Sequence, residues 1–565
     1  MKAKKAEGKL NTRNKAAPAM KYAGLVSVCA TGAFLTGLPV RAVALNLYNG
    51  TQYGNNVEIN LTTTVSYTGM YRVNSPSAIL TGPANANGSE GDINFRHGVV
   101  GNLFEAVPVL DVKDGDYGAH VSGQIYLNTV YLGTNQNNQP GTLNALYVGK
   151  STDFTSATRN VDGENAQLLD AFVYAQHQFA GDQTVQLKVG RQVLFWGQSL
   201  YFPTDGISGG QAPINVVAAQ NLINPQAQQV FMPVGQAVLT YNPRPDVTLQ
   251  GYYQFEWEHD YLQGAGAYFN GNDFLDKGGQ SLIVGNVPGV GNEYFLRSKD
   301  ISPGHQNGQF GLSVQFEVSN WDFGLFGERF DAKTPEVYAY PGAGGVAAIS
   351  TPVAAGLAVG RYALVYPRDI WLEGGSFSTN IGAANVAGEV SARENQPLAT
   401  GLNVPAASNN TNGNPAYPVG TTLDMQLSTI YVTPALSFDP GGATVTGEVV
   451  VNHVLGGIKN KAALSPGLQG TAAAFDLGIA PTYYNIVSNL DVTIPVSITY
   501  DFLGRSEMDT SIYHGNGVFD VGVTGTYRHT WIASLSYQDY LGKPNTTYNQ
   551  IADRGFVSLN LQHTF

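Results

Sequence analysis

Cysteine is almost absent from this chain of 565 residues: the only one is Cys29, inside an N-terminal stretch with the features of an export signal. A single cysteine cannot form an internal disulfide, and the chain without that stretch has no thiol at all. The sequence therefore excludes disulfide scaffolds, cysteine-dependent enzymes and cysteine-ligated metals.

Charge and long apolar runs are also scarce. Charged residues make up 13% of the chain, and the mean hydropathy is −0.10. No stretch of about 18 uncharged apolar residues follows residue 45, so helical membrane spans are not expected. Glycine (67 residues) and tyrosine (31 residues) are abundant instead. Low charge without apolar runs is typical of a protein whose polar and apolar residues alternate, as in a membrane β-barrel.

Residues 1–44 are predicted to be an export signal. A basic segment precedes the apolar run "AGLVSVCATGAFLTGLPV", and Ala42 and Ala44 are the small residues that a signal peptidase requires, so cleavage is expected after Ala44. Met20 is an alternative translation start, because a signal beginning there would have ordinary length. Without residues 1–44 the chain has 22 basic and 41 acidic residues, a formal net charge of −19. This argues against nucleic acid or an anionic lipid surface as a partner.

Strict alternation of apolar and polar residues recurs along the remaining chain. One face of each alternating segment is apolar and the other polar, as in a half-exposed strand. Each segment has about the 9–11 residues that a tilted strand needs to cross a bilayer. The clearest examples are 57–71, 246–258, 309–318, 490–500 and 556–565.

Short and long connections alternate between these segments, which is the pattern of an outer-membrane barrel with short periplasmic turns and long extracellular loops. We predict an all-β, antiparallel transmembrane barrel over 45–565 with 18 strands, or 16 as the alternative because 369–380 and 471–487 alternate poorly. Both ends should then lie in the periplasm of a Gram-negative bacterium. The predicted turns are 113–116, 180–183, 242–246, 319–322, 439–443 and 528–530; the predicted loops are 73–93, 131–166, 196–234, 259–307, 333–368 and 394–420.

The last residue, Phe565, ends an amphipathic strand. It looks like the terminal aromatic residue by which the barrel-assembly machinery recognises its substrates, so we expect that machinery and outer-membrane lipid as partners. Aromatic residues near strand ends are expected to form interfacial girdles on the lipid side. These are Tyr67, Tyr71, Trp257, Trp321, Tyr500, Tyr527 and Trp531.

Five segments resemble the outer-membrane barrel family known as domain of unknown function 1302, a branch of the porin-like barrels. They are "GDINFRHG" (91–98), "LKVGRQVLFWGQS" (187–199), 253–279, 366–398 and "DRGFVSLNLQHTF" (553–565). The resemblance implies a barrel for uptake or envelope traffic of hydrophobic or aromatic compounds, with a periplasmic or lipoprotein partner. The chain departs from the family pattern at 214–234, which has no charged residue, so a charged constriction does not carry over.

The loop 196–234 is the main candidate site. Its apolar segment must be buried, either inside the barrel as a constriction, which we favour, or in an extracellular cap. The polar side chains of the proposed constriction are Asn215, Asn221, Asn224, Gln226 and Gln228. Charged residues on the polar faces of strands should point into the lumen, where they either select solutes or simply line an aqueous space. These are Glu256, Glu258, Glu317, Glu389, Arg393 and Glu448.

Signatures of enzymes and cofactors are missing from the sequence. No HExxH, GxSxG, phosphate loop or dinucleotide motif occurs, and the turn with Asp111, Asp114 and Asp116 lacks the later carboxylate of a calcium loop. We therefore predict no cofactor, no metal and no enzymatic activity. The sequence favours an outer-membrane channel for small hydrophobic or aromatic solutes. The alternatives are a structural or surface-binding protein and, least favoured, an outer-membrane hydrolase.

Overall fold

A computed structural model describes residues 44–565, except 180, 276, 304–307, 412, 436–440 and 509–511. The predicted export signal therefore lies outside the described residues apart from Ala44. Among the helices that the structure describes, none is long and apolar enough to cross a membrane.

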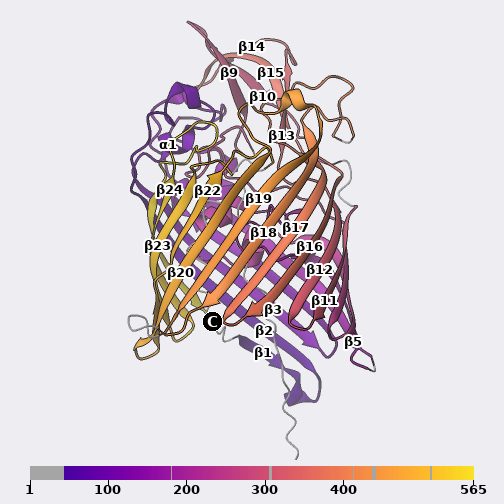
Figure 1. Cartoon of the computed structure of the whole chain (residues 1–565). Coiled ribbons are helices and arrows are strands. Elements are labelled where there is room, and N and C mark those ends of the chain that lie inside the picture. Colours follow the sequence, from indigo (N-terminus) through magenta and orange to yellow (C-terminus); the bar gives the residue numbers. More distant parts are fainter. Residues whose placement is uncertain are drawn as a thin grey trace, which may run out of the picture.

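Eighteen antiparallel strands form a closed barrel (Figure 1). β2 and β25 close the ring, with Thr64 opposite Thr564 and Arg72 opposite Phe556. A short strand, β1 (Leu45–Asn49), pairs with β2 below the end of β25. The wall strands are β2 (Val57–Arg72), β3 (Gly98–Asp114), β4 (Tyr117–Asn128), β5 (Glu164–Gln178), β6 (Thr184–Gln192), β7 (Val234–Arg244), β8 (Val247–Gln254), β11 (Gln309–Val318), β12 (Trp321–Phe330), β16 (Ile370–Ile381), β17 (Ala384–Pro397), β18 (Val419–Val432), β19 (Ala443–Lys459), β20 (Thr471–Val487), β21 (Leu490–Thr493) continued by β22 (Val496–Leu503), β23 (Gly517–Tyr527), β24 (Trp531–Leu541) and β25 (Phe556–Thr564).

The alternation in the sequence explains how each strand sits in the wall. In β11, Leu312 is 69% exposed on the outside, whereas Gln309 and Ser313 point inward and are buried. Exposed leucines and valines recur on the outer face of the other strands, among them Leu325, Leu427, Leu477 and Leu535. An apolar outer band around a closed sheet is what lipid requires. The chain is therefore a β-barrel of the Gram-negative outer membrane, as predicted.

The predicted count of 18 strands is confirmed, because the two poorly alternating segments form β16 and β20. All six predicted turns connect wall strands at one end of the barrel, which we call the turn end. Two further tight turns, 382–383 and 488–489, were not predicted. The long loops lie at the opposite end, the loop end, while β1 and the C-terminus lie at the turn end (Figure 1).

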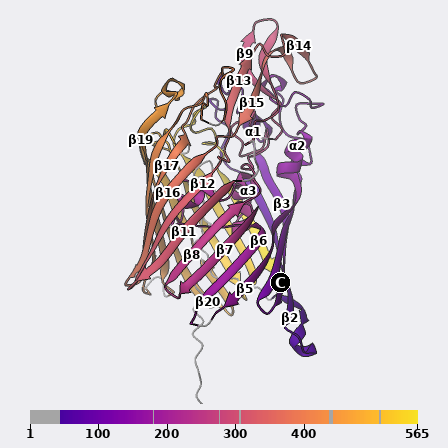
Figure 2. The ribbon, with the colours of Figure 1, turned by 90° about the vertical axis from the view of Figure 1, so that its right-hand side faces the viewer.

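A second sheet, which we call the loop sheet, projects beyond the loop end (Figures 1 and 2). Its five strands come from two of the predicted long loops, 259–307 and 333–368, so these loops contain regular structure of their own. They are β9 (Ser281–Val287), β10 (Gly291–Arg297), β13 (Glu336–Pro341), β14 (Ala347–Ser350) and β15 (Ala355–Val365).

The girdle prediction was wrong for Trp257. β8 ends at Gln254, and Trp257 is only 8% exposed, packed with Leu282, Phe295 and Tyr366 in the interior of the loop sheet. In contrast, Trp321 and Trp531 are exposed at the turn-end starts of β12 and β24. The alternating pattern in the sequence continues past the end of β8, and for this reason Trp257 was wrongly predicted to face the lipid.

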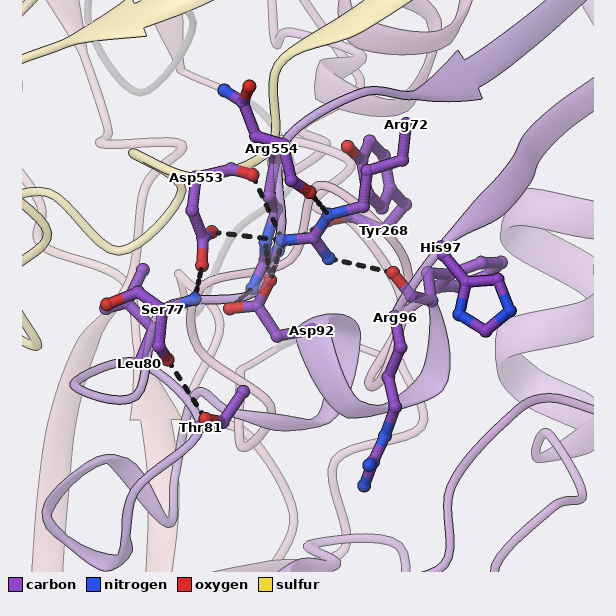
Figure 3. Close-up of polar contacts among 12 residues, drawn as sticks. Arg72, Ser77, Leu80, Thr81, Asp92, Arg96, His97, Tyr268, Asp553 and Arg554 are labelled. Atoms are coloured by element: carbon purple, nitrogen blue, oxygen red, sulfur yellow. Dashed lines mark hydrogen bonds and ion pairs between the residues drawn. The ribbon is translucent and has the colours of Figure 1, made fainter.

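A buried charge cluster fixes the loops to the barrel rim (Figure 3). Arg72, at the end of β2, donates to Asp92 of α1 (Glu90–Asn94) at 2.8 Å. Arg554, just before β25, lies 3.4 Å from the same carboxylate and donates to the carbonyl oxygens of Tyr268 and Asn270 at 2.5 Å each. The cluster thus joins the loops after β2, β8 and β24, because its members come from all three.

Candidate functional site: a loop inside the barrel

The connection between β6 and β7, residues 193–233, contains η6 (Ile207–Gly210), α3 (Val216–Asn221) and α4 (Ala227–Val230). Asn215 caps α3, because its side-chain oxygen accepts the Ala218 N–H at 3.0 Å. The segment 214–231 closes on itself: the Met232 N–H donates to the Pro213 carbonyl oxygen at 2.8 Å. Figure 2 shows α3 at the level of the barrel strands rather than above them.

Charged side chains of β17 and β19 hold the first part of this loop. The Glu448 carboxylate accepts the N–H groups of Leu200 and Phe202 at 3.1 Å, and also that of Tyr201. Glu389 accepts the Ile207 N–H at 2.8 Å and the Gln198 N–H.

Arg393 supplies the complementary contacts, because its guanidinium donates to the carbonyl oxygens of Thr204 and Gly206 at 2.8 and 2.7 Å. Backbone donors and acceptors of the loop are therefore satisfied by the barrel wall, as buried backbone groups require.

The second part of the loop reaches the opposite wall. Gln229 of α4 donates to Glu105 of β3, and Gln226 lies 3.5 Å from the Thr64 hydroxyl of β2. Ala218 and Leu222 pack against Leu103 and Tyr126 of β3 and β4. In a ring of 18 strands, β2–β3 and β17–β19 lie on opposite sides. The loop therefore crosses the interior of the barrel.

The five predicted amide residues all lie in this crossing segment, but several are engaged within it. Asn215 caps α3, and Gln228 donates to Gln226 at 2.6 Å. The side-chain amide of buried Asn221 has no hydrogen-bond partner among the described residues. Asn224 adopts a φ of 61°, in the left-handed region that asparagine tolerates.

The six predicted lumen charges fall into different environments. Glu389, Arg393 and Glu448 contact the loop as described above. Glu256 pairs with Arg191 of β6. Glu256 and Glu258 both lie beyond the end of β8 at Gln254, so their predicted places on the polar face of a strand were wrong. Glu317 is exposed near the turn end of β11, away from the loop.

A cavity of about 790 Å³ lies on the loop-end side of the crossing segment. Its walls come from seven connections, with loop residues from 204 to 216 on one side. Burial lowers the pKa of Lys333 to about 8 and raises the pKa of Glu336 to about 8. Lys333 donates to the Gly210 carbonyl oxygen at 2.6 Å and so anchors the loop from this side.

Sequence reasoning missed Lys333, and also Glu328 of β12, which accepts from Gln211 at 3.0 Å. Local patterns give no signal for contacts between residues this far apart in the chain. Within the described part of the chain, no group of three or more His, Cys, Asp or Glu side chains could hold a metal ion.

The architecture defines a class: an outer-membrane β-barrel whose interior is crossed by one of its own loops. Within that class, the chain belongs to the family described as protein of unknown function (DUF1302), whose model matches residues 24–565. No curated protein matches the chain.

Among solved structures, OccAB4 of Acinetobacter baumannii is 8% identical with a TM-score of 0.42, covering 90% of this chain and 98% of its own. A BenF-like porin from Pseudomonas fluorescens Pf-5 is 9% identical with a TM-score of 0.41 and the same coverages, 90% and 98%. OpdK of Pseudomonas aeruginosa, solved with vanillate, is 7% identical with a TM-score of 0.42, covering 89% and 98%. Likenesses this distant carry no functional argument.

Proposed function

We propose that this protein is a non-enzymatic channel that admits small, hydrophobic or aromatic molecules through the outer membrane. The observation that carries the proposal is the β6–β7 loop, which crosses the barrel and is bound on both sides of it. A barrel that only displays its loops at the surface needs no such crossing, whereas a wide barrel that selects solutes needs its lumen narrowed. Outer-membrane lipid, the solute and a periplasmic or lipoprotein partner are its proposed partners.

The lining of the cavity supports an organic solute. Apolar side chains from several loops predominate in it, and a volume of about 790 Å³ is in the range of sites for small organic molecules. The apolar lining residues include Ile214, Leu262, Phe274, Leu275 and Phe330. A solute would collect in this cavity before it meets the loop.

The constriction is proposed to be formed by the amide side chains of 214–231 together with the charged residues that hold 198–207. Asn221 is the best placed of the amides, because both its amide atoms are buried without a hydrogen-bond partner among the described residues. An unpaired buried amide gains hydrogen bonds when movement of the segment opens it to a passing solute.

Planar-bilayer recording tests the proposal. The purified protein should conduct ions in discrete steps, and a neutral aromatic solute such as 2-naphthamide should interrupt the current reversibly, whereas glycerol at equal concentration should not. Heat-modifiability on gels establishes that the barrel is folded. A folded protein without conductance in any preparation would favour the structural alternative. A conducting protein that treats both solutes alike would remove the hydrophobic or aromatic preference.

A further inference from the structure

Among the described residues, three cationic side chains line the cavity, and two of them are already engaged. Lys333 donates to the Gly210 carbonyl oxygen, and Arg393 donates to the carbonyl oxygens of Thr204 and Gly206. The third is Arg505, in the loop between β22 and β23. Among the residues that the structure describes, Arg505 forms no ion pair, and none of them accepts a hydrogen bond from its guanidinium.

Arg505 is nevertheless held in a defined position. Its guanidinium carbon lies 4.7 Å from the centre of the Tyr548 ring, and that ring stacks on Tyr513 at 5.2 Å with an interplanar angle of 21°. Its backbone is fixed as well: its carbonyl oxygen accepts the Gln469 N–H at 2.7 Å, and the residue forms an antiparallel bridge with Tyr513. The cation is thus preorganised on an aromatic surface, with no ion-pair partner among the described residues.

Apolar and polar side chains share the cavity with Arg505, the polar ones including Asp205, Ser465, Asn545 and Thr547. Leu468 and Met508 line the same cavity beside the two tyrosines. The acidic residue Glu336 also lines it, but burial raises its pKa to about 8, so at neutral pH it is mostly uncharged and does not neutralise Arg505. Asp260 is engaged elsewhere, because it accepts the Ile214 N–H at 2.7 Å and the Thr334 hydroxyl at 2.9 Å.

We infer that this corner of the cavity binds an organic carboxylate with an aromatic or apolar body: Arg505 receives the carboxylate, and Tyr548, Met508 and Leu468 receive the body. A planar guanidinium matches a carboxylate with two parallel hydrogen bonds, which an ammonium group cannot do. An inorganic anion would leave the apolar wall unused. The inference gives a substrate class to the proposed channel and rests on that proposal for its role in uptake.

Charge at long range works against this preference, since the chain without residues 1–44 has a net charge of −19. The local geometry outweighs it, because solvent ions screen charges beyond about 8–10 Å, whereas a direct contact in a partly buried cavity is screened much less. The charged group that this corner offers to a ligand is the guanidinium of Arg505. A cationic amphiphile would be repelled by the positive charge of Arg505 unless the Arg505 side chain moved away.

The test is calorimetric titration of the protein in nanodiscs with 2-naphthoate, 2-naphthamide and 2-naphthylmethylamine, with empty nanodiscs subtracted. The wild type should bind the carboxylate about 10- to 100-fold more tightly than the amide. Arg505→Gln should lower the affinity for the carboxylate to that for the amide and leave amide binding unchanged. Arg505→Lys should be intermediate.

Arg528→Gln is the matched control, because Arg528 also lies over a tyrosine, Tyr527, at 5.1 Å, but at the turn end of the barrel. This variant should bind all three probes as the wild type does. Equal wild-type affinity for carboxylate and amide, stronger binding of the amine, or full carboxylate affinity in both heat-modifiable Arg505 variants would overturn the inference. Conductance separates the two proposals: a conducting protein without carboxylate preference contradicts only the inference, and carboxylate binding without conductance contradicts only the channel.

Discussion

Replacing both Glu389 and Glu448 by glutamine should loosen the loop inside the barrel while leaving the wall intact. The two carboxylates accept five backbone N–H groups of 198–207. Hydrogen bonds to a charged acceptor are about twice as strong as neutral ones and contribute about 1.5–3 kcal/mol each. Glutamine keeps one acceptor oxygen but loses the charge, so each bond weakens by about 1 kcal/mol.

The double variant therefore weakens the attachment of the loop by at most about 5 kcal/mol, less where lumen water replaces the lost contacts. Because about 1.4 kcal/mol corresponds to a tenfold change in an equilibrium constant, even half of that shifts the loop between bound and released states by roughly 50-fold. The wall keeps its 18 paired strands, so heat-modifiability should not change.

Single-channel recording measures the effect as a higher mean conductance and more open-channel noise. Glu317→Gln is the control, because Glu317 is also a strand glutamate but is exposed near the turn end, away from the loop. Conductance and noise in the double variant that match those of the wild type and of Glu317→Gln would refute the idea that these carboxylates hold the loop.

Three further predictions concern the loops beyond the barrel. Burial raises the pKa of Asp273 to about 6, and burial together with the charge of Asp92 raises the pKa of Asp553 to about 6. Carboxyls that bind protons more tightly in the folded than in the unfolded protein contribute stability that is lost as the pH rises from about 4 to 6. Hydrogen exchange at 73–97 and 542–555, corrected for intrinsic rates, should therefore be slower at pH 5 than at pH 7.5, and equal protection would contradict this. Arg554→Ala leaves Asp92 without one of its two buried cationic partners, which should lower the local stability of these loops by about 3–5 kcal/mol. The loops should then become sensitive to protease in an intact barrel, whereas in the control variant Arg528→Ala they should not. Trp257→Ala should loosen the loop sheet by about 3–5 kcal/mol and accelerate proteolysis near 281–297, an effect that exposed Trp531→Ala should not share.

The barrel could be predicted from the sequence because each wall strand faces lipid on one side and polar groups on the other. Apolar and polar residues therefore alternate with a period of two in segments such as 309–318 and 490–500. The alternation of short turns and long loops further indicated that consecutive strands are antiparallel neighbours in the barrel. Glu256, Trp257 and Glu258 were misplaced because alternation continues beyond Gln254, where the strand ends. The end of a strand depends on where its hydrogen bonding to neighbouring strands stops, and the alternation of apolar and polar residues does not show that position.

The loop contacts could be predicted only in part. Apolar residues in 214–231 indicated that the loop had to be buried, and the polar faces of β17 and β19 placed Glu389 and Glu448 inside. Their contacts with 198–207 join residues up to about 250 positions apart, and no local pattern encodes them. Arg505 was missed for the same reason, because its position depends on Tyr548 from another loop.

The central claim is that the loop narrows the channel, and excising 214–231 tests it most directly. Pro213 and Met232 are already joined by a hydrogen bond of 2.8 Å, so two glycines can reconnect them with little disturbance of the wall. Planar-bilayer recording of this deletion variant and the wild type, both heat-modifiable, should show a larger conductance and weaker discrimination between 2-naphthamide and glycerol in the variant. Equal conductance and equal discrimination in the two proteins would show that the loop does not constrict the lumen.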